Sequence, residues 1–318
     1  MTRPLRIVFM GTPGFAVESL KVIHGSNHNV VGVITAPDRP AGRGRKLQAS
    51  EVKAYAKEHD LLILQPEKLR DSEFLNELKS LNADLFVVVA FRMLPELVWS
   101  MPPLGTINLH ASLLPQYRGA APINWAIING ETKTGATTFY IDAEIDKGKT
   151  IDTIEVDINP EDDARDLHDR LMHYGAQLLL KTIDMISEGK AVSSEQSESD
   201  STLKKAPKLN PENRKIDWTR SANETHNLIR GLSPYPSAYT HLVEPDLEKK
   251  SCKIYRTTIS ETQLLEEGQI ETDNKSYLKV GTATKDLFIE TLQLSGKKKM
   301  GIKDLLNGYS FVKGAIFR

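Results

Sequence analysis

The sequence contains a single cysteine and no long apolar run. Cys252 is the only cysteine among 318 residues, so an intrachain disulfide is impossible and we expect a cytoplasmic protein. No stretch reaches the roughly 18 apolar residues that a membrane-spanning helix needs. Residues 1–6, which include two arginines and no acidic residue, lead into the short apolar stretch IVFM and then a Gly-Thr-Pro turn. We therefore predict a buried first strand there and not a signal peptide.

Net charge is also nearly absent, but it is unevenly distributed. The formal net charge is −1, and the residues from Lys204 onward contain about 20 basic and about 14 acidic side chains. A basic C-terminal part suits a phosphate backbone, although charge alone leaves solubility as the alternative. The eight histidines show no metal-ligand spacing, because His168 and His173 are five residues apart and miss the i, i+4 pair of one helical face. We expect no metal.

Short apolar runs alternate with helical patterns in the first half of the chain. The expected strands are residues 5–10, 30–35, 61–64, 84–90, 106–110 and 135–141. The expected helices are residues 16–23, 51–59, 71–81 and 162–187. Apolar strands that alternate with helices are covered on both faces, so this pattern predicts an α/β fold with a doubly wound, mostly parallel sheet.

The character of the sequence changes between residues 188 and 206, which are polar, rich in serine and without periodicity. Such a segment is typical of an exposed connector. After it, the expected elements are a helix at 222–232 and short strands at 238–243, 252–259, 276–280 and 287–294. Several short strands separated by turn segments favour a small barrel or sandwich. We predict a first domain over 1–189, a linker over 190–206 and a second domain over 207–318.

The densest group of chemically active residue types lies in NLHASLLPQYRGAAPINWAI, residues 108–127. Asn108 and His110 are two apart near the carboxyl end of an expected strand, where open parallel sheets bind ligands. An amide and an imidazole that point together can stabilise an oxyanion and handle a proton, and Asp146 could orient the imidazole. Each also has a structural alternative, since His and Asn are common at strand ends and Asp146 fits a hairpin turn.

Six blocks of sequence, in order, resemble the methionyl-tRNA formyltransferases, within the wider folate-dependent formyltransferase family. They are FMGTPGFAVESL (9–20), PDRPAGRGRKL (37–47), NLHASLLPQYRGAAPI (108–123), IDKG (145–148), IRGLSPYPSAYT (229–240) and LQLSGKKKM (292–300). The blocks extend over nearly the whole chain, and SLLP-x-Y-R-G-A-A-P-I is highly specific. The resemblance implies a Rossmann-like N-terminal catalytic domain and a C-terminal tRNA-binding domain with an OB-like β-barrel.

The resemblance also implies a reaction and the residues that serve it. It implies 10-formyltetrahydrofolate as a co-substrate, methionyl initiator tRNA as the acceptor in translation initiation, and no obligate protein partner. The catalytic residues of the family fall on Asn108, His110 and Asp146. The implied folate-binding residues are Ser112, Leu113, Leu114, Pro115, Ala90, Phe91 and Arg92. The implied tRNA-binding residues are Arg39, Arg43, Arg45, Lys46, Lys297, Lys298 and Lys299, and Phe15 is expected near the methionyl end.

Several of these residues have a plainer interpretation. The basic loop over 37–47 could be a solvated loop, Phe15 a core residue and Arg92 either a surface arginine or a contact to the folate glutamate tail. The family usually has A-Y-G-x-I-L-P where this chain has AFRMLP over 90–95, one residue shorter and with arginine in place of glycine. This departure lies in the wall that is expected to grip the pterin.

Three other functions compete with this assignment. Glycinamide ribonucleotide formyltransferases and amino-sugar formyltransferases share the catalytic trio, and a non-catalytic RNA-binding protein represents a different class. The first group is much shorter and lacks a C-terminal domain. The second lacks the basic insertion loop in this form. An intact Asn-His-Asp set argues against the third.

Overall fold

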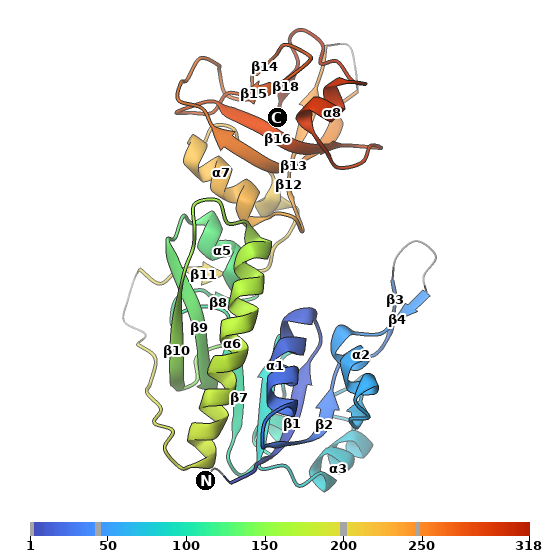
Figure 1. Cartoon of the computed structure of the whole chain (residues 1–318), viewed down its shortest axis with the longest axis vertical. Helices are drawn as coiled ribbons and strands as arrows, with labels where there is room; N and C mark the ends of the chain where they lie inside the picture. The colour runs from blue at the N-terminus through green and yellow to red at the C-terminus, as the bar shows by residue number, and fades with distance from the viewer. Residues whose placement is uncertain (1–2, 42–45, 198–201, 246–247) are drawn as a thin grey trace. The chain divides into compact units, whose positions relative to one another are not determined.

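The computed structural model describes residues 3–41, 46–197, 202–245 and 248–318 (Figure 1). The chain forms two compact units, each assembled from segments that are distant in sequence. Unit 1 comprises residues 1–119, 134–156 and 168–205, and unit 2 comprises 120–133, 157–167 and 206–318. Over the described ranges, no helix combines the length and the apolar character needed to cross a membrane. The domain boundaries at residues 189 and 206 stay a prediction.

A seven-stranded sheet of order β10-β9-β7-β6-β1-β2-β5 forms the centre of unit 1. Its strands are β1 (Arg6–Gly11), β2 (Asn29–Ile34), β5 (Ile63–Leu64), β6 (Leu85–Val89), β7 (Thr106–His110), β9 (Lys133–Tyr140) and β10 (Thr150–Asp157). The strands from β5 to β7 run parallel, and β9 pairs antiparallel with β7. The predicted mostly parallel sheet is confirmed. The apolar pattern misses β10, because acidic residues interrupt this edge strand.

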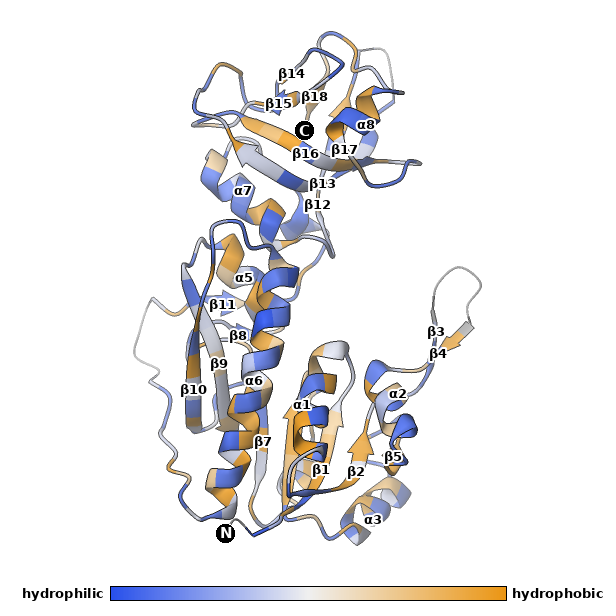
Figure 2. Ribbon diagram, viewed as in Figure 1, coloured by the Kyte–Doolittle hydropathy of each residue, from blue (hydrophilic) through white to orange (hydrophobic). Residues whose placement is uncertain are grey.

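Helices accompany this sheet because its central strands are apolar on both faces, as the orange β1 and β2 of Figure 2 show. The helices are α1 (Gly14–His24), α2 (Glu51–Glu58), α3 (Ser72–Ser80), α4 (Glu96–Trp99) and α6 (Ala164–Ser187). On one face, Val8 and Val88 of the sheet belong to one buried cluster with Phe74 of α3 and Val98 of α4. Helix α1 contacts β1, β2 and β6. These apolar contacts therefore hold helices against the central strands of the sheet.

A barrel-like antiparallel sheet forms the centre of unit 2, with the strand order β14-β15-β16-β13-β12-β18 and β17 paired to β16. Its strands are β12 (Ala238–Val243), β13 (Lys250–Ile259), β14 (Ile270–Thr272), β15 (Leu278–Val280), β16 (Leu287–Leu294), β17 (Met300–Gly301) and β18 (Ile316–Phe317). A bridge between Gln269 and Ile316 brings the two ends of this sheet together. The predicted small barrel is confirmed.

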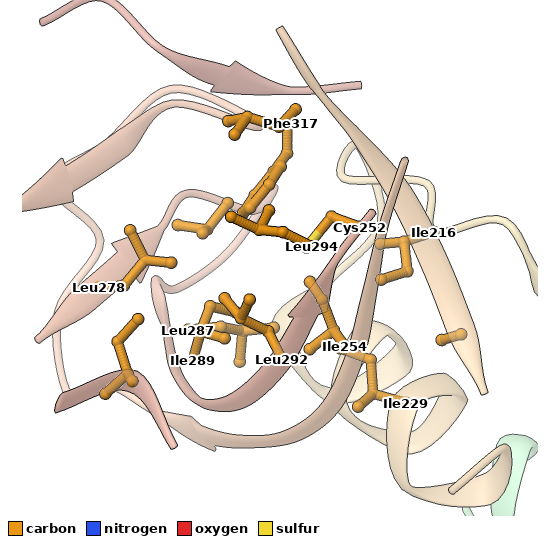
Figure 3. Close-up of a cluster of buried hydrophobic side chains, with 14 of the residues drawn as sticks. Ile216, Ile229, Cys252, Ile254, Leu278, Leu287, Ile289, Leu292, Leu294 and Phe317 are labelled. Atoms are coloured by element: carbon orange, nitrogen blue, oxygen red, sulfur yellow. The ribbon is translucent and has the colours of Figure 1, made fainter. Parts of the chain in front are cut away.

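Alternate residues of the barrel strands fill its interior. Cys252 and Ile254 of β13 lie beside Leu292 and Leu294 of β16 in one buried cluster (Figure 3). Burial raises the pKa of the Cys252 thiol to about 12, so this side chain is a neutral, apolar core group at neutral pH. The lone cysteine is therefore unsuited to act as a nucleophile.

Helices and short segments complete the chain. They are α5 (Pro122–Ile128), α7 (Ala222–Gly231), α8 (Ile302–Leu306), the 3-10 helix η1 (Glu212–Arg214), and the short strands β3 (Arg39–Ala41), β4 (Lys46–Gln48), β8 (Arg118–Gly119) and β11 (Lys205–Ala206). Helix α7 begins at a capping box in which Ser221 and Glu224 satisfy each other's backbone N–H groups. In unit 2, α5 packs against α7, and the Asn124 amide donates to the Gly231 carbonyl at 2.7 Å.

Candidate active site

Three neighbouring strands of unit 1 end at one edge of the sheet. The register aligns Gly11 of β1 with Val89 of β6, and Val89 with Leu109 of β7. The segments that follow these strands, residues 12–13, 90–95 and 111–117, therefore leave the sheet from the same edge. In open parallel sheets this carboxyl-end edge is where ligands bind.

Asn108 and His110 lie on one face of β7. Asn108 aligns with Val88, which packs in the cluster that includes α3 and α4, so both side chains extend toward that side of the sheet. Asn108 is half-buried, and none of the residues that the structure describes forms a hydrogen bond with its side-chain amide. A half-buried amide at a ligand-binding edge is a hydrogen-bond donor available to a substrate.

The imidazole of His110 lies between two oxygen acceptors. Its Nε2 is 2.9 Å from the carbonyl oxygen of Tyr117, and its Nδ1 is 3.8 Å from Oδ2 of Asp146. Because a carbonyl can only accept, the proton belongs on Nε2, and a second proton on Nδ1 would face the carboxylate. Both ring nitrogens of His110 therefore face an oxygen acceptor.

Asp146 reaches His110 from the loop between β9 and β10. Its side chain is 16% exposed, and its Oδ2 accepts a hydrogen bond of 3.0 Å from the backbone N–H of Gly119. Two residues later, a Cβ on the buried Gly148 would lie only 1.7 Å from the carbonyl oxygen of Tyr140. Glycine is required because the loop passes so close to the end of β9. Asp146 thus lies in the turn between β9 and β10, and its carboxylate faces His110.

The sequence analysis does not single out Arg118 and Gln196, which hold this loop. The carboxamide oxygen of Gln196 accepts from Nε and Nη2 of Arg118 at 3.0 and 2.7 Å. Its nitrogen donates to the carbonyl oxygens of Asp146 and Gly148 at 2.9 and 2.8 Å. No local pattern reveals these contacts, since Gln196 lies 50 residues after Asp146 and 78 after Arg118.

The loop that follows β7 is held by hydrogen bonds to itself and to β9. The buried Ser112 hydroxyl donates to the Gln116 carbonyl at 2.6 Å. The Leu114 N–H donates to Thr137 Oγ1 at 3.1 Å, and that hydroxyl donates to the Ser112 carbonyl at 2.7 Å. The half-buried residues of this loop are Leu113, Leu114, Pro115 and Gln116. These hydrogen bonds therefore fix the conformation of the segment that follows Asn108 and His110.

The segment after β6 contains the departure from the family pattern. Ala90 is exposed with a φ of 48°, and Phe91 is half-buried. Arg92 donates to the carbonyl of Glu67 at 2.9 Å and also to that of Pro66. Burial lowers the pKa of Arg92 below its ordinary value. The arginine that replaces the usual glycine thus ties this segment to the chain that follows β5.

Comparison with known proteins shows to which family this chain belongs. Residues 5–183 match the family described as Formyl transferase, and residues 208–310 match its C-terminal domain. The methionyl-tRNA formyltransferase of Flavobacterium johnsoniae is 54% identical over 310 residues, which cover 96% of this chain and 97% of the relative. That of Bacteroides fragilis is 51% identical over 308 residues, covering 96% and 95%. This chain belongs to the methionyl-tRNA formyltransferases.

A solved structure supports the fold of this formyltransferase. The N-formyltransferase of Helicobacter canadensis, solved with folinic acid and dTDP-3-aminofucose, superposes with a TM-score of 0.64 at 23% identity, covering 90% of this chain and 98% of that one. The family membership confirms the resemblance and shows that the chain is a transferase. It favours this assignment over the shorter formyltransferases, the amino-sugar enzymes and a non-catalytic RNA-binding protein.

The basic insertion of this formyltransferase forms the antiparallel hairpin of β3 and β4. Its base is anchored at Asp38, which accepts from Lys53 Nζ at 2.6 Å and from Gln65 Nε2 at 2.9 Å. These hydrogen bonds, first that of Gln65 and then that of Lys53, lower the pKa of Asp38 and keep it charged. Arg39 is exposed on β3.

The remaining residues of the insertion are less fully described. Arg43 and Arg45 lie outside the described residues, and only the backbone of Lys46, at the start of β4, is described. Their contribution to tRNA binding stays a prediction.

The three lysines expected to bind tRNA lie in unit 2, after β16. All three are exposed: Lys297, Lys298 and Lys299. The ammonium of Lys299 is 4.3 Å from the ring centre of Tyr255, and that of Lys297 is 5.8 Å from the ring centre of Tyr309. Aromatic rings thus support two of these cations while leaving their charge accessible to phosphates.

Phe15 lies at the start of α1, directly after the turn at the end of β1. It is 7% exposed, and its ring meets that of His168 edge-on at 5.3 Å between centres. A core role and a contact with the methionyl end both remain compatible with this position. Within the ranges that the structure describes, no three His, Cys, Asp or Glu side chains are placed to hold a metal ion. The absence of a metal stays a prediction.

Proposed function

We propose that this chain transfers the formyl group of 10-formyltetrahydrofolate to the α-amine of methionyl initiator tRNA, giving N-formylmethionyl-tRNA for translation initiation. The observation that carries the proposal is the position of His110 between the Tyr117 carbonyl and the Asp146 carboxylate, beside the available amide of Asn108. The relatives at about half identity support methionyl-tRNA as the acceptor. A neighbour solved with folinic acid supports a folate donor.

The proposed mechanism needs no covalent intermediate on the enzyme. The neutral α-amine attacks the formyl carbon on N10 of the folate, and the carbonyl electrons move to the oxygen. Asn108 donates a hydrogen bond to this oxyanion, and the positive charge of His110 stabilises it. Asp146 holds the ring and helps water carry a proton from the amine to N10, so that the C–N10 bond breaks and tetrahydrofolate leaves.

The substrate-binding roles form part of the same proposal. The braced loop over 112–115 and the segment over 90–92 bind the folate beside the trio. The hairpin residues Arg39, Arg43, Arg45 and Lys46, together with the lysines at 297–299, contact the tRNA. Phe15 contacts the methionyl side chain. An initiator tRNA substrate also implies a cytoplasmic location.

The direct test compares three acceptors with one labelled donor. We expect formyl label from 10-formyltetrahydrofolate to reach charged initiator tRNA much faster than glycinamide ribonucleotide or a nucleotide-linked amino sugar, at equal enzyme and donor. Product formation is measured as initial velocity over acceptor concentration, which compares kcat/KM values. Preferential labelling of either small acceptor would refute the proposed acceptor.

The insertion hairpin should discriminate between tRNAs. Arg43 stands between two glycines, and an arginine that contacts a base contributes about 1–3 kcal/mol of discrimination. We expect Arg43→Ala to lower the formylation efficiency of the initiator more than that of a poor elongator substrate, at fixed salt concentration. Arg165→Ala, which removes an exposed arginine from α6, is the matched control. An equal fall for both tRNAs would reduce Arg43 to a phosphate contact.

A further inference from the structure

The segment after α6 runs antiparallel beside the start of β10. Thr150 and Ser194 form a bridge in which each backbone N–H donates to the other residue's carbonyl at 2.9 Å. Next to this bridge, Lys149 and Glu195 form an exposed ion pair at 2.9 Å. In this antiparallel register, the residue two positions after Ser194 faces the residue two positions before Thr150. Gln196 therefore lies opposite the loop that contains Asp146.

The carboxamide of Gln196 uses its whole hydrogen-bonding capacity between this loop and Arg118. Both hydrogens of Nε2 go to backbone carbonyls, those of Asp146 at 2.9 Å and Gly148 at 2.8 Å. Its Oε1 accepts two hydrogen bonds from Arg118, at 3.0 and 2.7 Å. Because carbonyls only accept and a guanidinium only donates, the orientation of the amide is unambiguous.

The loop needs these hydrogen bonds because its backbone is strained at Asp146, the residue that provides the carboxylate. Asp146 has a φ of 56°, in the left-handed region that disfavours residues with a Cβ. The preceding residue, Ile145, is 64% exposed, so packing on that side does not hold the loop. Arg118 directly precedes Gly119, whose N–H binds the Asp146 carboxylate at 3.0 Å. Gln196 thus joins the two backbone segments that meet at this carboxylate.

We propose that Gln196 is a positioning residue for formyl transfer, which keeps the Asp146 carboxylate opposite Nδ1 of His110. The inference rests on the proposed function for its catalytic consequence, but its structural part is independent. Gln196 does not contact the reacting atoms and acts through the backbone of residues 146–148. Its loss should therefore affect the chemical step more than the binding of either substrate.

The most specific test of these hydrogen bonds is the variant Gln196→Glu. A glutamate has nearly the same shape and still accepts from Arg118, but it has no N–H group for the carbonyls of Asp146 and Gly148. We expect kcat to fall roughly tenfold, short of the about 10²-fold that a full 1 Å misplacement costs. The KM values for folate and tRNA should change by less than about twofold. The matched control is Glu195→Gln, which changes only the neighbouring exposed ion pair and should keep full turnover.

A double-mutant cycle separates positioning from a general structural effect. If Gln196 acts through Asp146, then Gln196→Glu should lower kcat no further in an Asp146→Ala background. A full additional tenfold fall in that background would overturn the proposal. Gln196 would likewise have a purely structural role if Gln196→Glu and Asp146→Ala each lowered kcat and thermal stability to the same extent and their effects on kcat were additive in the double variant.

Hydrogen exchange of the Gly119 amide gives a readout that does not depend on turnover. Because this amide binds the Asp146 carboxylate, we expect it to exchange faster in Gln196→Glu and unchanged in Glu195→Gln. Unchanged protection of Gly119 in Gln196→Glu would overturn the proposal. Suppose that the wild-type chain did not formylate methionyl-tRNA while Gly119 still lost protection in Gln196→Glu. The proposed function would then be wrong, but the structural claim that Gln196 holds the loop over 146–148 would remain supported.

Discussion

Replacing Asn108 or His110 by alanine should lower kcat for formyl transfer by about 10²–10³-fold, the usual cost of losing one group that stabilises an oxyanion. Asn108 supplies the available amide, and His110 supplies an imidazole whose Nδ1 faces the Asp146 carboxylate at 3.8 Å. Both variants should still fold, although His110→Ala also removes a buried hydrogen bond to the Tyr117 carbonyl and should lower the melting temperature modestly. Single-turnover rates with saturating donor and charged initiator tRNA, with melting curves of each variant, measure both effects.

Matched controls remove the same side chains elsewhere. His173→Ala on α6 and Asn223→Ala on α7 each delete an exposed residue of the same type. Both controls should keep wild-type transfer rates. Near-full turnover in Asn108→Ala or His110→Ala with a normal melting curve would show that the mechanism assigns the chemistry to the wrong residues.

Gly148→Ala should damage both the stability and the reaction. The added Cβ would lie 1.7 Å from the Tyr140 carbonyl oxygen, a backbone atom that cannot rotate away. Tyr140 also donates its N–H to the Lys149 carbonyl at 2.9 Å, so relieving the clash means separating the loop from β9. Overpacking of this kind costs about 1–3 kcal/mol of unfolding free energy. Because Asp146 would shift with the loop, kcat should fall by about 10²-fold.

Gly308→Ala provides the comparison, because a Cβ at Gly308 has no neighbouring atom within 4 Å. This control should retain its stability and its transfer rate. Chemical denaturation and single-turnover kinetics are the two measurements. If Gly148→Ala matched Gly308→Ala in both, the close passage of the loop along β9 would not be what places Asp146.

The part of the site on β7 follows directly from the sequence. A continuous apolar run predicts the strand, and the two-residue period of a strand puts Asn108 and His110 on one face. The approach of Asp146 is harder to predict, because it depends on β10, whose acidic residues hide the strand pattern. The residues alone leave Asp146 between orienting His110 and forming a hairpin turn, and only the resemblance to a known family favours the first.

Gln196 and Arg92 show what local patterns cannot reveal. Gln196 lies in a polar, serine-rich stretch that predicts only a connector, yet its carboxamide binds a loop 50 residues earlier in the chain. Arg92 departs from the family pattern, and its guanidinium is bound by carbonyls more than 20 residues away. Both contacts arise only once the sheet has brought distant segments to one edge. Side chains that act through long-range backbone contacts therefore escape sequence analysis.

The central claim is tested most directly by locating the formyl label after one turnover. Enzyme in excess over charged initiator tRNA is mixed with labelled 10-formyltetrahydrofolate, the aminoacyl ester is hydrolysed, and the amino acid is identified. We predict labelled N-formylmethionine from the wild-type chain, and a rate about 10²–10³-fold lower from His110→Ala. A folded wild-type chain that binds the folate but leaves the methionine unlabelled would contradict the account.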